Sequence, residues 1–374
     1  MKKGFIIFSG YNQRAVITFL RTLAREKIEF GIIASSTSDP IFDTAYAGRV
    51  FDIRRGPELT VKLVIESMKK VRKKIMADSC VIAPSTEALN RFLLENRGII
   101  EKNGFDIPLV GKKLYGAISD KLAFTLLCRK NRIAVPGGYP ALKAAKLPFA
   151  AKPKKYFSAG GKIYEPVLVL DKTERENFEK KYRASDFYFQ EYVEGKSIYL
   201  LYYFSKDGRV YKYSQENLAQ QPFGKSIIAA KSSAWHNTAE SFKYERLFKK
   251  LGFTGLVMVE VRKRGNKFYM IEANPRFWGP SQLFVDAGIN LFEPFIYDLG
   301  MKKEEPRFGR QKNARYFWYG GMKAARNTGK DCIFYGGRGK MLPGDISGWI
   351  SKDIYNRADT AGIFKKETLT GGSV

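Results

Sequence analysis

Short apolar runs and helically spaced apolar positions alternate through the first hundred residues. Residues 5–8 and 30–34 are apolar runs, and between them apolar side chains recur at intervals of three and four: Val16, Phe19, Leu20 and Leu23. This order predicts a strand, a helix and a second strand, which is a βαβ unit of a parallel sheet. A helix over 61–75, a buried strand over 79–84 and a helix over 86–94 are predicted next. Gly10 is the single glycine of the first turn, so a dinucleotide-binding fingerprint is absent.

The pattern changes near residue 111 and becomes rich in strands from Pro148 onward. Ser119 is predicted to cap a helix over 122–129. The strand-like runs that follow are PFAAKP, EPVLVL, FYFQEYV, SIYLLYYF and RVYKYS, and the α+β segment that they predict extends to about Gly300. The pattern beyond Met301 is weaker, and we expect this tail to pack on the main body as an appendage.

Polar side chains occupy every second position of the run MIEANPRFWG. In a strand, Glu272, Asn274 and Arg276 would point to the same face, because side chains two apart share a face. Residues 264–267 carry a turn signal, and a hairpin with the loop 265–267 would place Glu260 directly opposite Glu272. Two like charges there are destabilising unless a cation lies between them.

The candidate ligands Glu260, Glu272 and Asn274 offer only oxygen atoms. Such a set selects Mg²⁺ or Mn²⁺ over zinc, and a magnesium ion held by few carboxylates usually completes its shell with water and phosphate. The hairpin therefore predicts a nucleotide, with Arg276 placed to hold a phosphoryl oxygen. An exposed hairpin with unrelated charges is the alternative interpretation of the same pattern.

Length, charge and cysteine content limit the class of protein but do not identify its ligand. A chain of 374 residues with 44% hydrophobic content is long enough for two or three domains. The net charge of +28, from 65 Lys and Arg against 37 Asp and Glu, predicts attraction to anions: nucleotides, phosphorylated sugars, nucleic acid or an acidic membrane face. No apolar run approaches the roughly 20 residues of a membrane span. Three distant cysteines match no zinc or redox spacing, which indicates a reducing cytoplasm.

Several motifs in a fixed order resemble the ATP-grasp superfamily, and most closely its carbamoyl-phosphate-synthase-like branch. They are SDKLAF, PFAAKP followed by SAGGK, FQEYVEG, VMVEV and IEANPR, and the resemblance covers roughly residues 1–300. It implies a mixed α/β and α+β fold, with a Rossmann-like parallel-sheet domain over 1–115 before an ATP-grasp domain over 116–300. The latter would divide into a nucleotide lid over 116–188 and a metal and substrate subdomain over 189–300. Residues 301–374 would form the C-terminal appendage.

The resemblance also implies roles for residues at the nucleotide. Lys121 and Lys152 would contact phosphate, and a mobile glycine loop would cover it with backbone N–H groups. The hinge FQEYV would hold the adenine. These roles fall on Lys121, Lys152, Ser158, Ala159, Gly160, Gly161, Gln190, Glu191, Tyr192 and Val193. Ser197 stands where an acid often binds the ribose, and this departure leaves the ribose contact open.

The implied reaction is the phosphorylation of a carboxylate by ATP, with two Mg²⁺ or Mn²⁺ ions. Glu272 would bridge both ions, while Glu260 and Asn274 would each hold one. Arg276 and Lys152 are the expected catalytic residues. An amine or similar nucleophile would attack the acyl phosphate, with release of ADP and phosphate. His236 is the only histidine, so catalysis by histidine is not expected.

Small-molecule substrates are the expected partners, with negative charge suggested by Lys225 and Lys231 in QQPFGKSIIAAKSSAW. Relatives are often dimers, so a homodimer is a further expectation. Two alternatives stay open. Bicarbonate could be the carboxylate, which would make the chain a carboxylase or a carbamoyl-transfer enzyme. The other alternative is a basic nucleic-acid-binding protein. The aromatic residues, however, lie in apolar runs such as LLYYF, where core packing explains them. No stable nucleic-acid partner is therefore expected.

Overall fold

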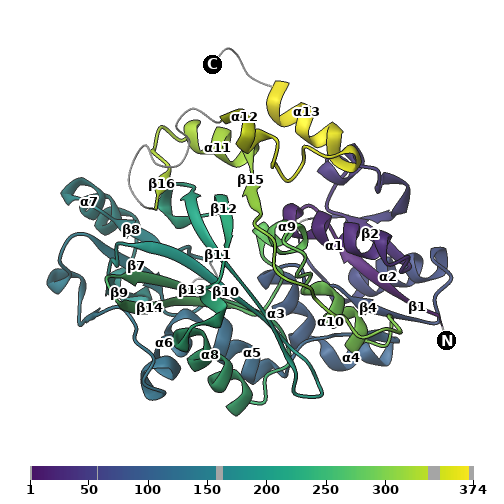
Figure 1. Cartoon of the computed structure of the whole chain (residues 1–374), viewed down its shortest axis with the longest axis horizontal. Helices are drawn as coiled ribbons and strands as arrows, with labels where there is room; N and C mark the ends of the chain where they lie inside the picture. Colours follow the sequence, from purple (N-terminus) through teal and green to yellow (C-terminus); the bar gives the residue numbers. More distant parts are fainter. Residues whose placement is uncertain (1, 57, 157–162, 336–345, 370–374) are drawn as a thin grey trace.

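The computed structural model of the chain describes residues 2–56, 58–156, 163–335 and 346–369. Figure 1 shows a parallel-sheet unit at the right, a larger body of antiparallel strands at the left and the C-terminal helices above both. This mixed α/β architecture, with one parallel sheet and two antiparallel sheets, confirms the predicted fold class. The glycine loop predicted at Ser158, Ala159, Gly160 and Gly161 lies outside the described residues.

The first unit is a sheet of five parallel strands in the order β3-β2-β1-β4-β5. Its elements are β1 (Lys3–Phe8), α1 (Gln13–Arg25), β2 (Phe30–Ala34), η1 (Pro40–Asp43), η2 (Ala47–Arg49), β3 (Val50–Ile53), α2 (Val61–Lys74), β4 (Ser79–Ile82), α3 (Glu87–Glu95), α4 (Arg97–Lys102) and β5 (Phe105–Asp106). The predicted βαβ unit is confirmed. Phe5 and Ile6 point to opposite faces and are both fully buried, as the apolar run requires for a strand covered on both faces.

Two helices and a small antiparallel sheet follow. They comprise α5 (Lys112–Ser119), α6 (Lys121–Lys130), β6 (Gly138–Tyr139), η3 (Leu142–Ala144), β7 (Phe149–Pro153), β8 (Val167–Val169), α7 (Lys172–Lys181), η4 (Ala184–Asp186) and β9 (Phe187–Glu191), with strand order β6-β9-β7-β8. The predicted cap at Ser119 is wrong, because Ser119 is the last residue of α5. Asp120 caps α6 instead, and its carboxylate accepts the backbone N–H of Ala123 at 2.8 Å.

The large sheet runs in the order β14-β13-β10-β11-β12-β15, with β16 paired to β11. Its strands and helices are β10 (Lys196–Phe204), β11 (Val210–Gln220), η5 (Pro222–Gly224), β12 (Ile227–Ser233), η6 (Trp235–Asn237), α8 (Ala239–Lys250), β13 (Gly255–Arg264), β14 (Lys267–Asn274), η7 (Gly279–Ser281), α9 (Gln282–Asp286), α10 (Phe292–Asp298), β15 (Arg315–Phe317) and β16 (Ile333–Phe334). After them come α11 (Tyr319–Arg326), α12 (Ile346–Ile350), η8 (Ala358–Thr360) and α13 (Ala361–Leu369).

Strand β10 separates two hydrophobic cores. Leu200 and Tyr202 point to the core under α6 and α8, while Leu201 and Tyr203 point to the core shared with the parallel-sheet unit. Strand side chains alternate between faces, so a strand buried on both sides reads as a continuous apolar run. The aromatic residues of this run are therefore core residues, as predicted.

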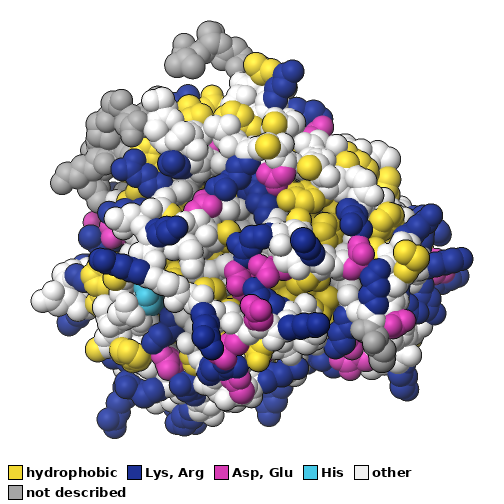
Figure 2. Space-filling model, turned by 45° about the vertical axis from the view of Figure 1, so that its right-hand side comes forward, with side chains coloured by type: hydrophobic (Ala, Val, Ile, Leu, Met, Phe, Trp, Pro, Cys, Tyr) yellow, Lys and Arg dark blue, Asp and Glu magenta, His cyan; other side chains and the backbone are white. Residues whose placement is uncertain are grey.

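The C-terminal segment contacts the large sheet and the parallel-sheet unit. Strand β15 pairs with β12, and β16 pairs with β11. Helix α13 lies against the first unit, where Lys366 forms an ion pair with Asp43 at 2.7 Å. Figure 2 shows Lys and Arg side chains spread over the visible face, with Asp and Glu between them rather than one basic patch. Within the described ranges, no helix is both long and apolar enough to cross a membrane.

Candidate active site

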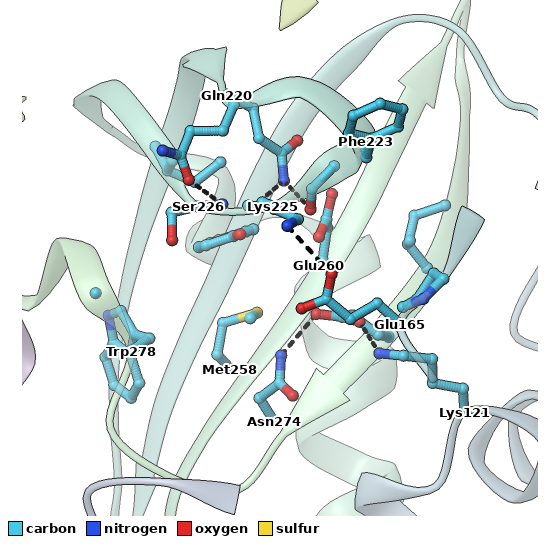
Figure 3. A pocket seen from close by; sticks show the side chains of 18 of the residues that line it. Lys121, Glu165, Gln220, Phe223, Lys225, Ser226, Met258, Glu260, Asn274 and Trp278 are labelled. Atoms are coloured by element: carbon cyan, nitrogen blue, oxygen red, sulfur yellow. Dashed lines mark hydrogen bonds and ion pairs between the residues drawn. The ribbon is translucent and has the colours of Figure 1, made fainter. Parts of the chain in front are cut away.

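A cavity of about 800 Å³ lies where the parallel-sheet unit, the small sheet and the large sheet meet. Figure 3 shows side chains from several of these elements converging on it. Its lining includes Asn12, Gln13, Arg14, Glu87, Lys121, Ala150, Lys152, Gln190, Glu191, Tyr192, Val193, Gln220, Lys225, Ser226, Met258, Glu260, Arg262, Glu272, Asn274, Arg276, Trp278, Trp318 and Tyr355. The structure thus brings most of the predicted site residues to one cavity. Lys225 is also in this lining, whereas Lys231 is exposed and is not.

The β13–β14 hairpin pairs Glu260 with Glu272, but its loop is shorter than predicted. Arg264 pairs with Lys267, so the turn contains only Gly265 and Asn266. Gly265 has a positive φ of 57°, as a tight two-residue hairpin turn requires. A register shift beyond Glu260 compensates for the shorter loop, because one extra residue on β14 restores the pairing of the two carboxylates.

The extra residue of this bulge is Ile271, since Val261 pairs with Met270 and Glu260 with Glu272. Its carbonyl oxygen accepts a hydrogen bond from Lys152 Nζ at 2.8 Å. The bulge therefore gives the lysine on β7 a backbone partner on β14. Irregular pairing of this kind is common beside functional sites, where it redirects groups that regular pairing would use.

The two paired carboxylates have different partners. Asn274 Nδ2 donates to Glu272 Oε1 at 2.7 Å, and Lys121 Nζ forms an ion pair with Glu272. Asn274 and Lys121 are labelled in Figure 3, where a dashed line leads from each side-chain nitrogen toward a carboxylate. Arg262 Nη2 lies 2.8 Å from Glu260 Oε1. Burial raises the pKa of Glu260. Burial acts in the same direction on Glu272, but the charge and hydrogen bond of Lys121, the hydrogen bond of Asn274 and the charge of Lys152 together outweigh it and lower the pKa of Glu272 to about 2.

Lys152 is only 6% exposed, and it shares the cavity with Lys121. Burial, reinforced by the nearby charge of Lys121, lowers the pKa of Lys152 to about 8. Buried lysines of this kind are rare unless a negative group compensates them. The cavity therefore suits a metal-bound phosphate ligand. The two lysines could pair with its negative phosphate oxygens, and the two carboxylates could pair with its metal ion.

The predicted hinge lines the end of the cavity next to β9. Gln190, Glu191, Tyr192 and Val193 all belong to the lining, and Gln190 Oε1 is buried without a hydrogen-bond partner among the described residues. Ser197 is placed differently, since it is fully buried and is absent from the lining. Its hydroxyl accepts from Asn217 at 2.9 Å and lies 3.5 Å from Glu260 Oε1, so the serine belongs to the sheet interior.

The opposite end of the cavity contains residues that the sequence analysis missed. Arg14 of α1 donates to Ile227 O and Tyr316 OH, both at 3.0 Å, and to Ser226 Oγ at 2.8 Å. Its guanidinium carbon lies 3.8 Å from the ring centre of Trp318. The one available signal was position, since Arg14 follows the carboxyl end of β1, the edge at which open α/β sheets bind ligands.

Unpartnered buried donors concentrate at this end. Gln13 Nε2, Arg276 Nε and Trp278 Nε1 are buried and have no acceptor among the described residues. Arg276 Nη1 donates to the carbonyl of Phe277 at 2.8 Å, which fixes the guanidinium beside the cavity. Because buried donors without partners are costly, these three atoms suit an oxygen-rich ligand.

The oxygen atoms of Glu260, Glu272 and Asn274 fit a hard divalent cation such as Mg²⁺. In the described part of the chain, no group of three or more His, Cys, Asp and Glu side chains forms a metal cluster, so a cation here would need the Asn274 amide and ligand oxygens in addition to the two carboxylates. His236 is outside the cavity lining, and its Nδ1 lies 2.9 Å from Ser214 Oγ. Burial lowers the pKa of His236 to about 4, as for a structural histidine.

Glu367 supports the wall that Trp318 contributes, and it gives a prediction for stability. Its carboxylate accepts from Trp318 Nε1 and Gly320 N, both at 3.2 Å, and burial raises its pKa from 4.5 to about 7. The folded chain therefore keeps a proton that the unfolded chain loses, and stability falls as the pH rises between these values. We expect a smaller drop in melting temperature between about pH 5 and pH 8 for Glu367→Gln than for the unsubstituted chain.

The exposed Glu304 provides the control for this comparison. Glu304→Gln should keep the full pH dependence, because it leaves the buried carboxyl of Glu367 in place. An equal pH dependence in Glu367→Gln and Glu304→Gln would contradict the assignment of the buried proton to Glu367.

Comparison with solved structures identifies the fold, although no family model and no curated protein sequence matches the chain. N5-carboxyaminoimidazole synthetase from Staphylococcus aureus, complexed with ADP, matches at 14% identity and a TM-score of 0.62, over 87% of this chain and 85% of its own. Biotin carboxylase from Campylobacter jejuni, in a β-γ-ATP complex, matches at 15% identity and a TM-score of 0.61, over 83% of this chain and 74% of its own.

A third neighbour is the biotin carboxylase domain dimer of 2-oxoglutarate carboxylase from Hydrogenobacter thermophilus, in complex with MgADP, ADP and bicarbonate. It matches at 15% identity and a TM-score of 0.60, over 84% of this chain and 73% of its own. All three neighbours are ATP-grasp enzymes. The motifs of this sequence, the antiparallel sheets around the cavity and these matches agree. The chain therefore has the ATP-grasp fold, preceded by a parallel-sheet unit.

Proposed function

We propose that the chain is an ATP-dependent ligase that phosphorylates a carboxylate and couples it to an amine or similar nucleophile, with release of ADP and phosphate. The observation that carries the proposal is the pairing of Glu260 with Glu272 in a cavity that also contains Asn274, Lys121 and Lys152. Phosphoryl transfer depends on positioning and charge neutralisation more than on covalent catalysis. The cavity contains lysines that could neutralise phosphate and carboxylates that could hold a metal ion.

Each residue of the proposed site has a task that its position allows. Glu260, Glu272 and Asn274 would hold Mg²⁺ or Mn²⁺, which when bound neutralises phosphate charge. Lys121 and Lys152 would bind phosphate oxygens. The hinge residues Gln190, Glu191, Tyr192 and Val193 would contact the base.

The acceptor substrate would bind at the end of the cavity where Arg14, Arg276 and Trp278 lie. Arg276 Nε has no acceptor among the described residues, and a donor of this kind can stabilise negative charge on the group being transferred. At this end, Arg14 of the parallel-sheet unit contacts Trp318 of the C-terminal segment. We therefore expect substrate specificity to depend on both segments and not on the antiparallel sheets alone.

Bicarbonate as the carboxylate is a second candidate, and the neighbours favour it. Two of the matched structures are biotin carboxylases or domains of that kind, and one was determined with bicarbonate. Activation of bicarbonate uses the same phosphoryl transfer, with carboxyphosphate in place of another acyl phosphate. The small number of atoms in bicarbonate would leave most of the 800 Å³ cavity to the nucleotide and the acceptor.

A screen of ADP release tests the proposal and separates the two substrates. The purified chain, MgATP and panels of carboxylic acids crossed with amines are assayed in buffer depleted of bicarbonate and again with bicarbonate added. We expect ADP release to require Mg²⁺ and one carboxylate–nucleophile combination. Release that needs bicarbonate would favour the second candidate. A chain that neither binds MgATP nor releases ADP with any combination would contradict both.

A further inference from the structure

Arg262 is a buried guanidinium that neither the motifs nor the proposed roles explain. It follows Glu260 by two residues on β13, so both side chains point to the cavity face of the sheet. Arg262 is 8% exposed, and its Nη2 lies 2.8 Å from Glu260 Oε1. Its Nη1 is buried without a hydrogen-bond partner among the described residues. A buried charged donor left unpartnered is costly, so its retention points to a ligand.

Tyr335 holds this guanidinium from the C-terminal segment. Arg262 Nη2 donates to Tyr335 OH at 2.6 Å, and the guanidinium carbon lies 4.2 Å from the centre of the tyrosine ring. Tyr335 OH in turn donates to Gln220 Oε1. The backbone of Tyr335 is also fixed, because its N–H donates to Leu218 O at 3.0 Å beside the β16–β11 pairing. The tyrosine is therefore anchored to the same sheet that carries the arginine.

Along β13, Arg262 lies between Arg264, which contacts the hinge, and Glu260, one of the paired carboxylates. At one end of β13, Arg264 forms an ion pair with Glu191 of the hinge at 2.5 Å. The backbone at Gly195 also approaches this end so closely that an added Cβ would lie 2.2 Å from Lys263 O. Glu260 lies two residues further along than Arg262. In any nucleotide the sugar joins the base to the phosphates, so Arg262 occupies the level of the ribose.

We propose that Arg262, positioned by Tyr335, binds a ribose hydroxyl of ATP. Arg262 would thus make the ribose contact that the motif assigns to the position of Ser197. The proposal rests on the proposed function, since it assumes that the base lies at the hinge and the phosphates at the carboxylates. Ser197 pairs with Arg262 across β10 and β13, but its hydroxyl is occupied by Asn217 and lies near Glu260. Arg262 presents an unused donor at the same level of the sheet. Because Tyr335 holds Arg262 in place, this role for Arg262 would also make the C-terminal segment part of the nucleotide site.

Binding calorimetry without turnover tests this assignment. MgADP, Mg-2′-deoxy-ADP and Mg-3′-deoxy-ADP are titrated into the unsubstituted chain, Arg262→Met, Arg262→Lys and Tyr335→Phe. We expect the unsubstituted chain to bind MgADP tighter than at least one deoxy nucleotide. Arg262→Met should bind MgADP about 10- to 100-fold more weakly and should no longer distinguish the three nucleotides. Tyr335→Phe should lose part of the same discrimination, because the ring remains while the hydroxyl that orients the guanidinium is removed.

Two variants protect the test against a loss of folding. Arg262→Lys keeps a cation beside Glu260 and should fold, yet it should lose the ribose discrimination because it lacks the second donor arm of arginine. Arg72→Met is the matched control, since Arg72 also lies over an aromatic ring, that of Phe105 at 4.8 Å, but outside the cavity lining. It should bind all three nucleotides as the unsubstituted chain does.

Failure of this inference is distinct from failure of the proposed function. If the unsubstituted chain does not bind MgADP, the proposed function fails and the inference falls with it. If it binds MgADP and Arg262→Met binds equally well, only the role of Arg262 is overturned. An equal loss of affinity for MgADP and both deoxy nucleotides in Arg262→Met would overturn the ribose assignment. Unchanged discrimination in Tyr335→Phe would overturn the positioning role of the tyrosine.

Discussion

Replacement of Glu272 by glutamine should abolish turnover and leave the chain folded. We expect Glu272→Gln to lower the rate of ADP release by roughly 10³-fold or more, because the proposed bridging carboxylate would lose its charge while its size is kept. Binding of Mn²⁺ in the presence of ATP, followed by electron paramagnetic resonance, should weaken in parallel. The ion pair between Lys121 and Glu272 is also lost, so the lysine would have to find its partner in the nucleotide alone.

Glu245 provides a matched control for this substitution. Its carboxylate accepts from Lys212 at 2.9 Å and lies 3.0 Å from Lys249, so it too is a partly buried glutamate with lysine partners, but it lies outside the cavity lining. Glu245→Gln should keep turnover and Mn²⁺ binding while losing a comparable set of ion pairs. Retention of full ADP release by Glu272→Gln would remove Glu272 from the proposed metal site.

The hairpin was predictable because its signals are local in sequence. The polar positions of Glu272 and Asn274 and the turn residues between the strands determine which side chains share a face and which strands pair. The loop length was not predictable in the same way. A two-residue turn and a bulge at Ile271 give the same pairing of Glu260 with Glu272 as the predicted three-residue loop, so the pattern of polar residues could not separate them.

The far end of the cavity could not be predicted from local patterns. Arg14 is more than three hundred residues away from Trp318 and Tyr355 in the sequence, and no spacing connects it to them. Arg14 belongs to no motif of the sequence, and Tyr355 lies in the tail beyond Met301, where the pattern is weak. Their convergence depends on the pairing of β15 with β12 and on the packing of α13 against the parallel-sheet unit, which is tertiary information.

Ser197 illustrates the limit of a motif-based alignment. The motif locates the residue at the start of β10 correctly, but it does not state what the side chain contacts. In the structure the serine hydroxyl is occupied by Asn217, while Arg262 on the adjacent strand reaches the cavity. The register that pairs Ser197 with Arg262 joins two strands that are distant in the sequence, so a local motif does not contain it.

Removal of the buried cation at Lys152 should sharply weaken nucleotide binding. We expect Lys152→Ala to lower the affinity for MgATP by roughly 10²-fold, because charge-assisted bonds to phosphate would be lost in a desolvated site. Affinity for adenosine, which carries no phosphate, should change little. The pH dependence provides a second signature. With a pKa of about 8, Lys152 is an ammonium below that value, so MgATP affinity should fall as the pH rises through it.

The same titrations with Lys152→Ala should show a flatter dependence on pH, since the group that loses its proton is absent. Lys212 serves as the control, because this partly buried lysine of β11 pairs with Glu245 and does not line the cavity. Lys212→Ala should bind MgATP like the unsubstituted chain at every pH. If Lys152→Ala also bound MgATP normally, Lys152 would be a structural lysine that serves the carbonyl of Ile271 and not the phosphates.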